Sequence, residues 1–130
     1  MPGVVVGYVA KPEGEAALVR AVEEARLRDL SLVIVSSQHE EANEEWVRKT
    51  EADLAAARER LDASGVAYEI RHTVAGVGAA DDLVEIAEET QADLLVIGVR
   101  RRSPVGKLIL GTQAQRILID APCPVLAVKD

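Results

Sequence analysis

Aromatic residues and cysteine are scarce in this chain of 130 residues, which has one Trp, two Tyr, no Phe and one Cys. A core without aromatics must be built from Val, Leu, Ile and Ala, and such a core suits a parallel sheet that helices bury on both faces. The single cysteine, Cys123, excludes a disulfide within the chain. We therefore expect a reducing, cytoplasmic compartment.

Long hydrophobic runs and an excess of positive charge are missing as well. No apolar segment approaches the ~20 residues that a membrane span needs, and no basic stretch followed by an apolar one predicts a signal peptide. The formal net charge of −7 argues against nucleic acid or an anionic membrane as a partner. A hydrophobic content of 48% with 28% charged residues predicts a single domain over residues 1–130.

Apolar runs alternate with helical patterns along the whole chain. The runs predict strands at 4–8, 31–37, 68–74, 93–98 and 124–129. Helical spacing predicts helices at 13–28 and 40–63, a third around 81–87, and a fourth from 112 to about 120. Helical crossovers of this length imply parallel strands and right-handed connections. The predicted fold is α/β, a doubly wound open sheet of five parallel strands with four helices.

The segment after the fourth predicted strand has the opposite charge to the rest of the chain. From residue 99 to 119 it has no Asp or Glu, and its cations are Arg100, Arg101, Arg102, Lys107 and Arg116. Ligands of open parallel sheets bind beyond the carboxyl ends of the strands. Gly98, Gly106 and Gly111 let backbone N–H groups approach anionic oxygens, and Gly111-Thr112 opens a helix with free N–H groups. These features indicate a phosphate site, and the alternative is a solvated loop.

Residues for catalysis or metal binding do not form a recognisable pattern. We find no nucleophile with a base at suitable spacing, and His39 and His72 have no neighbouring ligand residues. The sequence therefore predicts neither a catalytic centre nor a metal site, and at most a weak ATPase activity.

The segment from Gly98 to Thr112, followed by Ala-Pro-Cys-Pro-Val-Leu-Ala-Val at 121–128, resembles the C-terminal signature of the universal stress proteins. Residues 4–8 and 93–98 resemble the first and fourth strands of that family, so the resemblance covers essentially the whole chain. It implies a Rossmann-like fold of the adenine-nucleotide alpha-hydrolase type that is usually dimeric. In the nucleotide-binding branch it implies a site for an adenine nucleotide such as ATP, AMP or cyclic AMP.

The family's nucleotide loop has a glycine, a second glycine after two residues, and a third after nine more that precedes Ser or Thr. Gly98 and Gly111-Thr112 match its ends, whereas Arg101 replaces the middle glycine. Val9 stands where the family often has Asp, and Val35 matches a position whose backbone meets adenine. The residues expected to bind the nucleotide are Val9, Val35, Gly98, Arg100, Arg101, Gly106, Gly111 and Thr112.

Three functions stay open at this point. The first is a stress-response module that binds an adenine nucleotide, and the second is a dimeric interaction protein with an empty loop and an unidentified acidic partner. The third and least favoured is a weak ATPase. The apolar last strand is expected at a sheet edge, where uncovered strands associate. Because the family commonly pairs this strand with its mate, the resemblance predicts a homodimer through Val125 to Val128.

Overall fold

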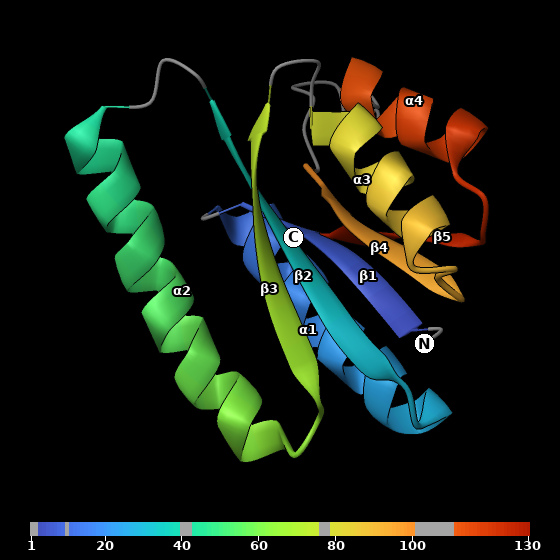
Figure 1. Ribbon diagram of the computed structural model, residues 1–130, viewed down its shortest axis with the longest axis horizontal. Coiled ribbons are helices and arrows are strands. Elements are labelled where there is room, and N and C mark those ends of the chain that lie inside the picture. Colours follow the sequence, from blue (N-terminus) through green and yellow to red (C-terminus); the bar gives the residue numbers. More distant parts are fainter. Residues whose placement is uncertain (1–2, 10, 40–42, 76–78, 101–110) are drawn as a thin grey trace.

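Strands and helices alternate through the computed structural model, which describes residues 3–9, 11–39, 43–75, 79–100 and 111–130 (Figure 1). The elements in chain order are β1 (Gly3–Tyr8), α1 (Pro12–Arg28), β2 (Ser31–His39), α2 (Glu44–Ser64), β3 (Tyr68–Ala75), α3 (Ala79–Glu89), β4 (Leu94–Val99), α4 (Thr112–Asp120) and β5 (Val125–Lys129). These bounds lie close to those that the sequence predicts. The second strand is longer than expected and continues to His39.

The strands form one parallel sheet in the order β3-β2-β1-β4-β5. Helices α1 and α2 lie on one side of it, and α3 and α4 lie on the other (Figure 1). The chain therefore moves outward from β1 in one direction and returns through α3 to build the other half from β4. The predicted doubly wound α/β fold is confirmed, and β5 lies at a sheet edge as expected.

Local sequence signals explain where the helices begin and end. Pro12 occupies the start of α1, where its missing N–H costs nothing, and the helix ends at Arg28, followed by Asp29 in the left-handed conformation. Helix α2 is followed by Gly65 at a φ of 78°, a conformation that glycine adopts without strain.

Each face of the sheet has its own hydrophobic core, which is aliphatic apart from Tyr8 on the α1–α2 face. On the α1–α2 face, Val4, Val6 and Tyr8 of β1 pack with Ala17, Leu18, Leu54 and Leu61 among others. On the α3–α4 face, Val5, Val35, Leu83, Leu95, Ile97 and Ile117 form the second core. Consecutive β1 residues face opposite cores because side chains alternate along a strand.

The sheet opens at the junction of its two halves. Pairing between β1 and β4 ends at Val6 with Val96. On either side of the junction, β1 pairs with β2 as far as Tyr8, and β4 pairs with β5 as far as Val99. The carboxyl ends of β1 and β4 therefore diverge at the topological switch point, which is where open α/β sheets bind ligands.

Candidate functional site

A cavity of about 240 Å³ lies at this junction. We call it the core cavity, because five of its lining residues belong to the hydrophobic core of the α3–α4 face. It is lined by Gly7, Tyr8, Val9, Gly14, Val35, Ala80, Leu83, Ile97, Gly98, Gln113, Ala114 and Ile117. Val35, Leu83 and Ile97 are 1–6% exposed, so they form fixed, apolar walls. Such a cavity suits a flat, largely apolar group.

A second cavity of about 530 Å³ adjoins the first. We call it the rim cavity, and it is lined by Val9, Glu13, Gly98, Val99, Arg100, Gly111, Gln113 and Ala114. Val9, Gly98, Gln113 and Ala114 line both cavities. Ligand pockets usually measure about 300–1,000 Å³, so the two cavities together can hold a ligand larger than a single ring system.

The first turn of α1 closes one side of the junction by contact between backbones. A Cβ atom added at Gly98 would lie 2.0 Å from the carbonyl oxygen of Glu13, and one added at Gly14 would lie 1.8 Å from the carbonyl oxygen of Val9. Both glycines are therefore required by packing between α1 and the ends of β1 and β4. The sequence interpretation of Gly98 as a phosphate-facing glycine misses this structural role.

Gly111 differs from Gly98, because a Cβ atom there would meet nothing within 4 Å among the described residues. Its φ of −68° is open to any residue, and it is the N-cap of α4 without a side-chain hydrogen bond to the helix. The backbone N–H of Gln115 donates to the carbonyl oxygen of Gly111, which is the first helical hydrogen bond of α4 among the described residues. The preceding N–H groups and the helix dipole make this helix start suitable for an anion.

Helix α4 is held in place by the start of α3. The backbone N–H of Ala80 donates to Oε1 of Gln113 at 3.0 Å, and Nη2 of Arg116 donates to Oδ1 of Asp81 at 2.9 Å. The side-chain amide of Gln113 thus caps α3 while Gln113 also lines both cavities. These contacts fix the position of the α4 N-terminus relative to the core cavity.

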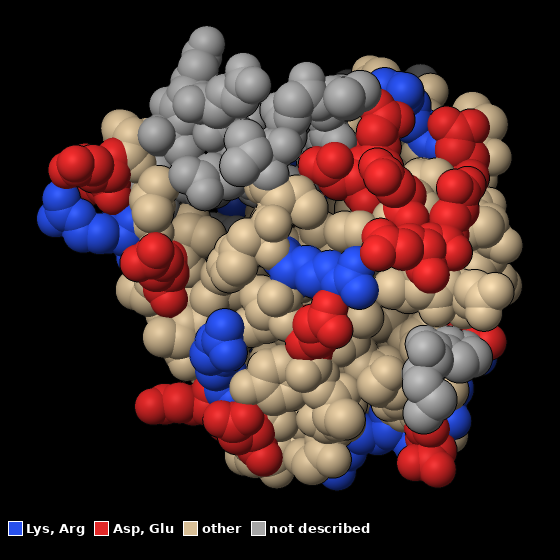
Figure 2. All heavy atoms as spheres, in the orientation of Figure 1, with Lys and Arg blue, Asp and Glu red and all other residues tan. Residues whose placement is uncertain are grey.

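Arg71 and Arg100 differ in how closely they pair with carboxylates. Acidic side chains gather over α3 (Figure 2). The acidic residues of this helix are Asp81, Asp82, Glu85, Glu88 and Glu89. Arg71 pairs with Glu69 and, at 3.5 Å, with Glu89. At the rim cavity, Nε of Arg100 lies 4.0 Å from Oε1 of Glu13, and the Arg100 side chain is 58% exposed. Among the described residues that line the rim cavity, Arg100 is the cation, and its ion pair is long.

Three hydrogen-bonded side chains, those of Tyr8, Glu15 and Arg60, connect β1 with α1 and α2. The Tyr8 hydroxyl donates to Oε1 of Glu15 at 2.6 Å, and Nη2 of Arg60 donates to Oε2 at 2.8 Å. Burial raises the pKa of the Tyr8 phenol, and the hydrogen bond to Glu15 raises it further. Burial alone would raise the pKa of Glu15, but the hydrogen bonds from Arg60 and Tyr8 and the charge of Arg60 lower it below its usual value.

The structure gathers most of the predicted nucleotide residues at the cleft. Val9, Val35, Gly98, Arg100 and Gly111 line one or both cavities. Thr112 begins α4 and is exposed beside them. Arg101 and Gly106 lie outside the described residues. Sequence reasoning missed Glu13, Gly14 and Gln113, whose positions in the first turns of α1 and α4 were the available signal.

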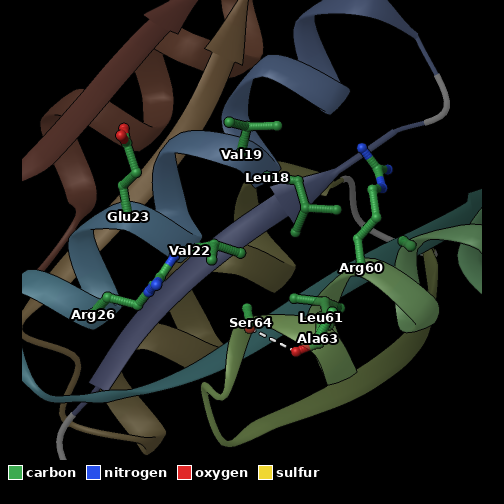
Figure 3. Close-up of a pocket in the computed structure, with 10 residues that line it drawn as sticks. Leu18, Val19, Val22, Glu23, Arg26, Arg60, Leu61, Ala63 and Ser64 are labelled. Carbon is green, nitrogen blue, oxygen red and sulfur yellow. Dashed lines mark hydrogen bonds between the residues drawn. The ribbon is translucent and has the colours of Figure 1, made fainter.

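Another hollow of about 310 Å³ lies between α1 and α2, away from the switch point. Figure 3 shows Leu18, Val19 and Val22 of α1 on one side of it, and Leu61 and Ser64 of α2 on the other. None of the predicted nucleotide residues lines it. Among the described residues, no three potential metal ligands gather, and no helix is long and apolar enough to cross a membrane.

Comparison with known proteins defines the class of this fold. A solved universal stress protein from Archaeoglobus fulgidus is 33% identical and superposes with a TM-score of 0.85 over 99% of both chains. A second structure from that organism, a universal stress protein in complex with dAMP, is 27% identical with a TM-score of 0.77. The match covers 99% of this chain and 98% of that one.

Sequence comparison places the chain within the same class. The model of the universal stress protein family matches residues 2–129. A universal stress protein of Mycolicibacterium smegmatis is 43% identical over 126 residues, which are 97% of this chain and 96% of that protein. The chain belongs to the universal stress protein family, as its C-terminal signature indicates.

Proposed function

We propose that this protein is a stress-response module that binds an adenine nucleotide at the junction of β1 and β4. The observation that carries the proposal is the pair of adjoining cavities, one walled by core residues and the other bordered by Arg100 and the start of α4. The similar structure from A. fulgidus that holds dAMP supports this choice of ligand.

Each end of the cleft suits a different part of a nucleotide. The core cavity offers the base apolar contacts from Leu83 and Ile97, and Val35 lies in its wall. The rim cavity offers a phosphate the start of α4 and the guanidinium of Arg100. Val9 brings methyl groups instead of a carboxylate to the passage between the two. The roles predicted for Arg101, Gly106 and Thr112 remain part of this proposal.

Calorimetric titration with ATP, AMP and cyclic AMP tests the function, and Gly111→Ala is the variant that probes the phosphate end of the cleft. Gly111→Ala should fold like the wild type, because its Cβ enters open space. It should nevertheless bind nucleotides about tenfold more weakly if the new methyl group displaces a charged hydrogen bond to phosphate. No heat and no thermal shift with any of the three nucleotides would rule the proposal out.

A second proposal concerns self-association through β5. This strand ends the sheet order, and Val125, Leu126 and Val128 are only partly buried. An apolar edge strand is a site for pairing with another chain, so we propose a homodimer through Val125–Val128. Light scattering at micromolar concentration should give twice the mass of the chain, and a monomer would contradict the proposal. The lone Cys123 supports a reducing cytoplasm as the compartment.

A further inference from the structure

The cleft contains a buried carboxylate that the sequence pattern did not single out. Glu13 follows Pro12 in the first turn of α1, and the residue is 7% exposed. Its side chain is nine-tenths buried, with an exposed fraction of 10%. Burying a charged group is costly unless it finds hydrogen-bonding partners. Nε of Arg100 lies 4.0 Å from the carboxylate, which is too long for a hydrogen bond, and Glu13 lines the rim cavity.

The location of Glu13 in the cleft places its carboxylate near the sugar of a bound nucleotide. A ligand with its base in the core cavity and its phosphate in the rim cavity must pass the residues that line both, which include Val9 and Gly98. Glu13 lines the rim cavity next to these two residues, and its carbonyl oxygen lies directly against Gly98. The sugar of such a ligand therefore lies near Glu13.

Hydrogen-bonding chemistry also favours the sugar over the phosphate as the partner of Glu13. Ribose hydroxyl groups are hydrogen-bond donors, and an ionised carboxylate only accepts. Glu13 is the one carboxylate among the described residues that line the two cavities. Val9 is apolar, and Oε1 of Gln113 already accepts the N–H of Ala80. A phosphate would be repelled by the Glu13 charge, which favours placing the phosphate toward the start of α4 and the sugar at Glu13.

We propose that Glu13 recognises the sugar by accepting hydrogen bonds from the ribose 2′ and 3′ hydroxyls, and so selects ribonucleotides. The inference rests on the proposed nucleotide binding and adds a specificity-determining residue to it. It competes with a purely structural role, in which Glu13 only stabilises the positive end of the α1 dipole.

The test combines two ligands with four proteins in calorimetric titrations. The ligands are AMP and 2′,3′-dideoxy-AMP, and the proteins are the wild type, Glu13→Ala, Glu13→Gln and the control Glu23→Ala. Glu23 lies on the same helix with a side chain that is 59% exposed. Wild type and control should bind AMP about tenfold more tightly than the dideoxy analogue, since hydrogen bonds to charged groups are the strong ones. The ratio of the affinity for AMP to the affinity for the dideoxy analogue should fall to about one in Glu13→Ala and lie between one and ten in Glu13→Gln.

The ratio separates recognition from a structural effect. If Glu13 has only a structural role, its substitution should weaken the binding of both ligands equally and leave the affinity ratio at its wild-type value. That outcome would overturn the inference. Equal binding of both ligands by the wild type would also overturn it while leaving the proposed function intact. If the wild type binds neither ligand nor ATP, the proposed function fails and the inference with it. Circular dichroism checks folding, and Glu13→Gln decides the question if Glu13→Ala unfolds.

Discussion

The core cavity and the rim cavity adjoin, yet their residues contribute differently to the folded state. Val35, Leu83 and Ile97 of the core cavity are almost fully buried, so the same atoms that would contact a base also stabilise the sheet. Val9 is 45% exposed at the rim cavity, and Arg100 and Gly111 are exposed as well. Binding and stability are therefore coupled at these core-cavity residues and separable at the exposed residues of the rim cavity.

Ile97→Ala should have the largest effect, because it removes a side chain that belongs to both the core and the cavity. We expect a loss of about 3 kcal/mol in the free energy of unfolding, together with weaker binding of adenosine. Denaturant unfolding measures the first effect and calorimetry the second. Leu27→Ala, at a site that is 80% exposed, is the control and should change stability by about 0.5 kcal/mol or less. Equal losses in the two variants would show that Ile97 is not a core residue.

Gly98→Ala should follow with a loss of about 2 kcal/mol, because backbones must move apart to admit the methyl group. Its Cβ would lie 2.0 Å from the carbonyl oxygen of Glu13. Gly111→Ala, where a Cβ meets open space, should stay within about 0.5 kcal/mol of the wild type in the same unfolding experiment. If the two variants are equally stable, the distinction between a packing glycine and a ligand-facing glycine is lost.

Arg100→Gln should weaken nucleotide binding at the rim cavity with little change in stability. We expect about tenfold lower affinity for AMP, because a charge-assisted bond to phosphate is lost. Titrations at low and high salt should show that the variant has the smaller salt dependence. Arg26→Gln, which changes a cation at the α1–α2 hollow, is the control. An unchanged affinity in Arg100→Gln would place the phosphate elsewhere.

Glu15→Gln should have the smallest effect, and that effect should depend on pH. The pKa of Glu15 in the folded protein lies below its ordinary value of 4.5, because the effect of burial is outweighed by hydrogen bonds from Arg60 and Tyr8, so folding favours the ionised form. The stabilisation is fully present above that value and disappears as the pH falls through the lower folded pKa. The wild type should therefore be more stable than Glu15→Gln at pH 7, and the difference should shrink below about pH 4.5. A difference that is the same at pH 7 and pH 3 would contradict the pKa shift.

Much of the fold could be predicted from the sequence, because its signals are local. The run at 93–98 and the alternating pattern at 68–74 predicted β4 and β3 closely. Pro12 and Gly65 marked helix ends through their own backbone preferences. The prediction of β2 fell short at residue 37, where apolar residues give way to polar ones although pairing with β3 continues to His39.

The candidate site was only partly predictable, because burial and close approach depend on distant elements. Gly98 attracted notice as a loop glycine, but its contact with Glu13 spans most of the chain. Glu13 resembles any acidic residue in a first helical turn until α1 packs against β4. Its burial follows from that packing and leaves no trace in the local pattern of residues.

The amino-acid sequence by itself determined the alternation of strands and helices, the parallel sheet and the family, since hydrophobic periodicity and loop residues act over a few positions. Only the tertiary structure decided where the sheet opens, at the end of pairing between Val6 and Val96. It also decided that residues of α1 and α4 line two adjoining cavities there, and that the carboxylate-bearing Glu13 is buried in the wall of one of them. These features arise from contacts between distant segments, whose energies depend on how whole elements pack.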